Sequence, residues 1–155
     1  MNIIRPSNCY APGQQLHRII PKTILYALTG RKLALHGGGK ARKSYLHADD
    51  LSRAIMSVVS RGTLGEVYNV GPDAPTPIRE VVERCLKATG KTWDLVEEAP
   101  DRMGQDGCYF LDSSKIKTLG WEQTVGWDEG LQTMVDWVNS YPELQKLSTE
   151  FQMRA

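Results

Sequence analysis

The sequence predicts an α/β fold for this chain, and two observations lead to that prediction. Apolar runs typical of strands alternate along the chain with amphipathic segments typical of helices. The 155 residues are 41% hydrophobic and 24% charged, which is the composition of a folded domain with a core of its own. Too few strands are recognisable for a complete doubly wound sheet, so we do not expect one.

The first half of the chain contains two expected strands and two expected helices. Residues 1–4 are apolar and run into a polar segment, 5–12, so they predict a strand that ends in a loop; a later strand or another chain must cover it. Residues 20–28 predict a short helix, and 32–36 a strand that ends at the glycine turn 37–40. Asp49 and Asp50 open the clearest helix, because acids favour the positive end of the helix dipole. Its expected apolar face is made of Leu51, Ala54, Ile55, Val58 and Val59.

The second half continues the alternation. Residues 65–71 predict a strand bounded by glycines, and an amphipathic helix starts at 77–80 and closes at Gly90. Two more helices are expected, at 113–119 and 128–139. Residues 141–155 are expected to form a polar, loosely held tail.

Composition excludes several classes of function. The net charge of +1 gives no general attraction for nucleic acid, and no apolar run approaches the roughly 20 residues that a membrane-spanning helix needs. The first residues lack the apolar core of a signal peptide, so we expect a cytoplasmic protein without a membrane or nucleic-acid partner. The three cysteines and three histidines show no metal-ligand spacing, so we expect reduced thiols and no metal.

The glycine turn does not predict a phosphate loop. A GxxxxGK[ST] motif ending at Lys40 would need glycine at position 34 and a hydroxyl at 41, where the sequence has alanine. A GxGxxG fingerprint starting at Gly37 would need glycine at position 42, which is Arg42. The cations Arg42 and Lys43 beside the turn leave two interpretations open: a solvated basic loop before a helix, or a clamp for a diphosphate.

Seven short motifs in one order carry a family resemblance. They are Arg5-x-Ser7-Asn8-x-Tyr10-x-Pro12, Ile20-Pro21, the segment from Gly30 to Gly39, Arg42-Lys43-Ser44-Tyr45-Leu46-His47-x-x-Asp50, Tyr68-Asn69-Val70-Gly71, Asp101-Arg102-x-Gly104 and Leu119-Gly120-Trp121. Together they resemble the C-terminal, substrate-binding half of the extended short-chain dehydrogenases of the NAD-dependent epimerase/dehydratase family, closest to the dTDP-glucose 4,6-dehydratases. The resemblance covers residues 1–140, of which 1–12 would be a remnant of the Rossmann strand and loop.

The resemblance implies a small α/β substrate-binding domain of an extended short-chain dehydrogenase, with the N-terminal Rossmann half missing. In that family the Rossmann half holds NAD, and the reaction oxidises the sugar C4 hydroxyl, removes water across C5 and C6, and returns the hydride to C6. The catalytic Tyr-x-x-x-Lys pair has no counterpart here. The residues four places after the tyrosines are Gln14, Gly30, Asp49, Pro72, Ser113 and Gln145. We therefore expect this chain alone to be inactive, with no catalytic residue and no bound cofactor.

The resemblance also implies a set of binding residues. The substrate contacts would come from Asn8, Arg18, Ile19, Ala34, Leu35, His36, Arg42, Lys43, Asn69, Asp101 and Arg102. Lys43 would grip the diphosphate, Asn8 would hydrogen-bond the diphosphate or the sugar, and residues 34–36 would line the base pocket. Lys43 stands where the family has an arginine, so bidentate geometry is lost while the charge is kept, and Arg42 would compensate. Cys9 stands at a position near the nicotinamide where asparagine is common.

Three functions follow as alternatives. The chain is the nucleotide-sugar-binding portion of a dehydratase or of a related epimerase; or it is a non-catalytic module that keeps the fold; or it is one part of a split enzyme completed by a separate Rossmann-domain chain. The partner expected in each case is a nucleotide-diphosphate sugar.

Overall fold

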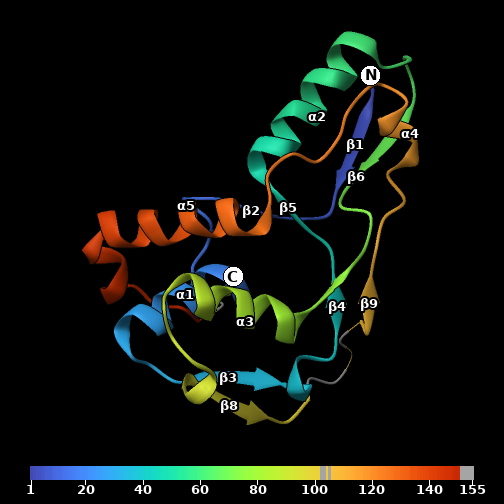
Figure 1. Cartoon of the computed structure of the whole chain (residues 1–155). Coiled ribbons are helices and arrows are strands. Elements are labelled where there is room, and N and C mark those ends of the chain that lie inside the picture. The colour runs from blue at the N-terminus through green and yellow to red at the C-terminus, as the bar shows by residue number, and fades with distance from the viewer. Residues whose placement is uncertain (102–103, 105, 151–155) are drawn as a thin grey trace, which may run out of the picture. The chain divides into compact units, whose positions relative to one another are not determined.

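The computed structural model describes residues 1–101, 104 and 106–150, and they form two units (Figure 1). The described residues of 1–10, 41–77 and 105–126 make the first unit, and those of 11–40, 78–104 and 127–155 make the second. Helices and strands alternate in both, so the α/β prediction is confirmed. No helix within the described ranges is long and apolar enough to cross a membrane.

The first unit is built mainly from strands. Its strands are β1 (Ile3–Pro6), β2 (Asn8–Tyr10), β4 (Arg42–Lys43), β5 (Tyr45–His47), β6 (Val67–Val70), β7 (Thr76–Pro77) and β9 (Cys108–Tyr109). Its helices are α2 (Ala48–Arg61) and α4 (Ser114–Lys117). The N-terminal strand β1 pairs in parallel with β6, with Ile3 opposite Val67, so a later strand covers it. Strands β2 and β5 form a second parallel pair, and β4 lies between β7 and β9.

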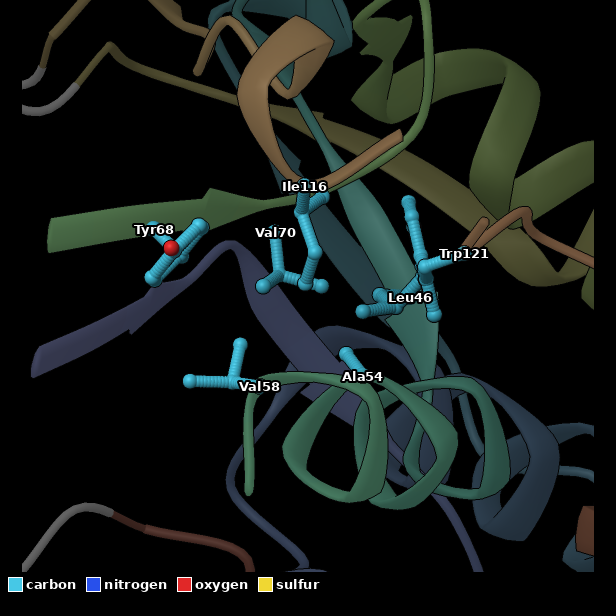
Figure 2. Packing of buried hydrophobic residues seen from close by; sticks show 7 residues of the cluster. All are labelled: Leu46, Ala54, Val58, Tyr68, Val70, Ile116 and Trp121. Atoms are coloured by element: carbon cyan, nitrogen blue, oxygen red, sulfur yellow. The ribbon is translucent and has the colours of Figure 1, made fainter. Parts of the chain in front are cut away.

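One apolar cluster forms the core of the first unit (Figure 2). Its buried members are Leu46, Ala54, Val58, Tyr68, Val70, Ile116 and Trp121. They come from β5, α2, β6, α4 and the segment after α4, so the cluster joins stretches that lie far apart in the sequence. Burial of each large aliphatic side chain contributes about 1.5–3 kcal/mol, which makes this cluster the main force that holds the unit together.

The second unit contains three helices packed on one another and a short sheet. Its elements are α1 (Ile19–Thr29), β3 (Leu33–His36), the 3-10 turn η1 (Gly37–Gly39), α3 (Ile78–Ala88), the 3-10 turn η2 (Trp93–Leu95), β8 (Val96–Ala99), α5 (Trp127–Ser140) and the 3-10 helix η3 (Pro142–Lys146). Strand β3 pairs in parallel with β8, with His36 opposite Ala99. Helix α1 ends where Gly30 takes the left-handed conformation, φ 68°.

One expectation about burial differs from the structure. Helix α2 buries Ala54 and Val58, but Ile55 is 42% exposed and Val59 74% exposed, so the buried face is narrower than the apolar pattern predicts. Most described residues of the tail are exposed, as its polar composition suggests, but one of them is buried. Thr149 is buried and hydrogen-bonds the hydroxyl of Tyr26 in α1, with 2.7 Å between the two oxygens.

Candidate functional site

The predicted site residues divide between the two units. Asn8, Cys9, Arg42, Lys43 and Asn69 lie in the first unit. Arg18, Ile19, Ala34, Leu35, His36 and Asp101 lie in the second. Arg102 lies outside the described residues. We therefore describe the residues of each unit separately.

Asn8 and Asn69 lie near the carboxyl ends of the parallel pair β1 and β6. Asn69 is the third residue of β6, opposite Arg5, and Asn8 follows β1 after a single intervening residue. The backbone N–H and the side-chain Nδ2 of Asn8 both donate to the carbonyl oxygen of Ser44, each at 3.1 Å. In open parallel sheets, ligands bind outside the carboxyl ends of the strands, so both amides have a suitable position.

Cys9 is half-buried beside the core of the first unit. Its Sγ donates to the carbonyl oxygen of Ser7 at 3.5 Å, and burial raises the pKa of its thiol. The raised pKa keeps the thiol protonated near neutral pH, which is the wrong state for a nucleophile. Cys9 therefore acts as a small packed side chain in this unit.

Arg42 and Lys43 point in different directions, because successive side chains of a strand project to opposite faces. The Arg42 guanidinium is exposed and donates to the carbonyl oxygen of Pro75 at 3.1 Å. The Lys43 ammonium lies 3.9 Å from the Oδ2 of Asp106. The two cations therefore have different neighbours in the first unit.

Lys43 is the more confined of the two cations. Its side chain is only 19% exposed, and its Nζ lies 6.0 Å from the ring centroid of Tyr109. Tyr109 reaches it because β4 and β9 are parallel neighbours with Lys43 opposite Tyr109. An ammonium whose stem is buried attracts anions more strongly than one on a freely moving side chain.

In the second unit, residues 34–36 do not all face the same way. Ala34 is exposed and His36 half-buried, but Leu35 is buried in an apolar cluster with Leu33, Val82 and Leu86. The period of two along β3 explains the difference. The Leu35 side chain therefore belongs to the core, and only its neighbours are available to line a pocket.

His36 and Asp101 lie together at the carboxyl end of the β3–β8 pair. His36 lies opposite Ala99, the last residue of β8. Its Nδ1 is 2.8 Å from the carbonyl oxygen of the next residue, Pro100. The Asp101 carboxylate lies against the glycine turn: a Cβ built on Gly37 would come within 2.6 Å of its Oδ1.

In the same unit, Arg18 is the exposed N-cap residue of α1, and the half-buried Ile19 packs on the apolar cluster of Leu35.

The glycine turn does not fit a dinucleotide. Gly37, Gly38 and Gly39 all have positive φ, but strand β4 follows them where a Rossmann phosphate loop opens a helix. The carboxylate of Asp101 also lies against the first of these glycines, and it would repel a pyrophosphate. No NAD phosphate site is assigned to this turn, and no metal-binding cluster of His, Cys, Asp and Glu occurs among the residues that the structure describes.

Two groups of residues near the site were not found by sequence reasoning. Asp106 and Tyr109 contact Lys43, and no local pattern links them because 63 and 66 residues separate them from it. A concavity of about 730 Å³ in the first unit is lined by Gly71–Asp73, Lys117 and residues 120–126. It contains no residue of the predicted site, so its volume carries no argument for nucleotide binding.

Comparison with known proteins gives consistent results. Residues 1–71 match the model of the NAD dependent epimerase/dehydratase family. The dTDP-glucose 4,6-dehydratase of Streptomyces niveus is 37% identical over 136 residues, which is 87% of this chain and 40% of that protein.

Solved structures with the same fold include two enzymes of this group. A dTDP-glucose 4,6-dehydratase from Bacillus anthracis in complex with NAD superposes with a TM-score of 0.85 at 36% identity, over 94% of this chain and 46% of that one. A UDP-glucose 4-epimerase from Thermotoga maritima with UDP-glucose gives a TM-score of 0.84 at 27% identity, over 92% and 47%. The chain thus spans less than half the length of these relatives.

Proposed function

Because this chain is similar over most of its length to proteins of the NAD dependent epimerase/dehydratase family, we propose that it belongs to that family and is the part that binds a nucleotide-diphosphate sugar in a 4,6-dehydratase. In the complete enzyme, NAD would accept and return the hydride while the sugar loses water. The residues of this chain would bind and orient the nucleotide end of the substrate, and they would not carry out the chemistry.

The observation that carries this proposal is the confined cation Lys43. It is held on the central strand of the β7–β4–β9 sheet, and its side chain is only 19% exposed. A single lysine provides a point charge for a phosphate, without the bidentate geometry of arginine. In the same unit, Asn8 and Asn69 would supply hydrogen bonds at the strand ends, and Arg42 would hold β7 through Pro75.

The residues proposed for the nucleoside lie in the second unit. His36 offers a half-buried ring for stacking or hydrogen bonding, and Asp101 offers a carboxylate next to it along the β3–β8 pair. Arg18 and Ala34 are exposed and would line the substrate, and Ile19 would add apolar contact. Arg102 belongs to the same proposal by its motif alone.

Sequence identity supports a dehydratase over an epimerase. The dehydratases compared above are 36–37% identical to this chain, whereas the epimerase is 27% identical at a similar TM-score. The assignment to a dehydratase rests on this difference in overall sequence identity.

Binding is tested by calorimetric titration of the chain with dTDP and with UDP. Loss of a hydrogen bond to a charged group costs about 1.5–3 kcal/mol, so Lys43→Ala should weaken dTDP binding by at least tenfold. Arg42→Ala is the matched control: it removes the neighbouring cation on the other face and should have a clearly smaller effect. Equal effects, or unchanged affinity in Lys43→Ala, would reject Lys43 as the phosphate ligand.

The partner we propose is a Rossmann domain, either in the same polypeptide or as a separate chain. Parallel sheets are normally covered on both faces and extended by further strands, yet the pair β1 and β6 has no third strand among the described residues. Several large apolar side chains of the same unit are exposed. They are Met1, Ile3, Ile55, Met56, Val59 and Leu64. Such side chains favour an apolar protein partner over solvent.

The partner is tested by co-expression with the N-terminal portion of the Bacillus anthracis dehydratase that the present chain does not match. Dehydration of dTDP-glucose by the pair, and by neither part alone, is the expected result. Val59→Glu should abolish the activity while dTDP binding persists, whereas Ser52→Glu, on a polar position of the same helix, should leave activity intact. Binding of dTDP without any activity would favour a non-catalytic module.

A further inference from the structure

We propose that the carboxylate of Asp106 competes with the ligand phosphate for Lys43, so that this chain carries its own weak inhibitor of phosphate binding. The proposal rests on the proposed function, because it concerns the regulation of that same site. It requires that the carboxylate be held near the ammonium, that Lys43 have few other anionic partners, and that the contact be weak enough for a ligand to displace it.

The backbone holds Asp106 near Lys43. The carbonyl oxygen of the next residue, Gly107, accepts the backbone N–H of Arg42 at 2.8 Å, and this bond continues the pairing of β9 with β4. Residue 106 therefore enters β9 next to the strand that carries Lys43. The distance of 3.9 Å between Lys43 Nζ and Asp106 Oδ2 follows from this pairing.

The surroundings of Lys43 leave the carboxylate as its anionic contact. The Lys43 Nζ also lies 6.0 Å from the centroid of the Tyr109 ring, and an aromatic ring attracts a cation only weakly at that separation. Lys43 makes no other ion pair within the part of the chain that the structure describes. An incoming phosphate must therefore share the ammonium with Asp106 or displace it.

The contact is weak enough to be displaced. The Asp106 side chain is 76% exposed, so water solvates the carboxylate well, and exposed ion pairs are worth at most about 1 kcal/mol. A diphosphate carries more charge than one carboxylate and offers several oxygens to the same ammonium. Binding would then break the Lys43–Asp106 contact, and the affinity would be reduced by about two- to fivefold relative to a chain without it.

The experiment measures dissociation constants of dTDP and of inorganic pyrophosphate by calorimetry for four proteins: the unchanged chain, Asp106→Asn, Asp73→Asn, and Lys43→Ala combined with Asp106→Asn. Asp106→Asn should bind both probes about two- to fivefold more tightly. Asp73→Asn is the matched control, because that carboxylate is 80% exposed and pairs with Lys117 in the same unit. It should leave both affinities unchanged.

The double variant separates a specific contact from general charge. If Asp106 acts through Lys43, its removal should give no gain once Lys43 is absent. Unchanged or weaker binding by Asp106→Asn, or an equal gain in Asp73→Asn, would overturn the inference and leave the proposed function standing. Absence of binding in all four proteins would overturn the proposed function, and the inference with it. Equal melting temperatures of the ligand-free proteins exclude misfolding as the cause.

Discussion

Asp50 should be one of the most sensitive positions in the first unit. Its side chain is fully buried at the start of α2 and accepts four hydrogen bonds. Arg53 Nη2 donates at 2.5 Å, Thr124 donates through its N–H at 2.8 Å and its hydroxyl at 3.2 Å, and the Val125 N–H donates at 3.1 Å. The carboxylate thereby ties the helix start to a segment more than 70 residues away.

Asp50→Asn should cost about 1.5–4 kcal/mol of the free energy of unfolding. If the amide oxygen replaces Oδ1, the amide NH2 group faces the Val125 N–H, and that buried donor loses its acceptor at a cost of about 1–3 kcal/mol. Loss of the ion pair between position 50 and the half-exposed Arg53 adds about 0.5–1 kcal/mol. With an m-value of about 2 kcal/mol per molar, in the middle of the usual range, the urea midpoint should fall by about 1–2 M.

The assay is urea unfolding followed by tryptophan fluorescence, in which the reporter of the first unit is the buried Trp121, whose Nε1–H donates to the carbonyl oxygen of Asp50 at 2.9 Å. Asp49→Asn is the matched control: its carboxylate is 69% exposed and should cost about 0.5 kcal/mol through the helix dipole. A loss below 0.5 kcal/mol for Asp50→Asn would refute the reasoning, because the buried donors would then have found other acceptors.

Two further predictions concern the second unit and the thiols. Tyr26→Phe removes the hydrogen bond to the buried Thr149 and should cost about 1 kcal/mol and speed proteolysis of the tail; an unchanged cleavage rate would show that this contact does not hold the tail. Thiol-labelling at pH 7.5 followed by peptide mass spectrometry should modify the exposed Cys108 first and the half-buried Cys9 more slowly. Burial raises the pKa of the Cys85 thiol, so Cys85 should react only after unfolding, and labelling as fast as that of Cys108 would contradict its burial.

The helices could be predicted from the sequence because their evidence is local. In α3, the apolar spacing of Val81, Val82, Cys85 and Leu86 coincides with the buried face, and α5 behaves in the same way. Helix α2 was predicted in position, but its outer side chains Ile55 and Val59 are exposed. Periodicity shows which side chains prefer an apolar environment, and it does not show what covers them.

The short strands and the contacts of Lys43 could not be predicted in this way. Strand β8 has the sequence Val-Glu-Glu-Ala and shows no apolar alternation, so its pairing with β3 decides its conformation. The opposite directions of Arg42 and Lys43 depend on the placement of β4 between β7 and β9. Motif order was sufficient to detect the similarity to the epimerase/dehydratase family, whereas the surroundings of individual side chains required the sheet register.

The interleaving of the two units has a consequence for how the chain is made. The backbone passes from one unit to the other after residues 10, 40, 77, 104 and 126, so no continuous stretch encodes either unit. During synthesis the first unit cannot close its core until Trp121 has left the ribosome, and the second must wait for α5. Terminal truncation therefore cannot isolate either half, and a dissection of this protein requires a redesigned chain order.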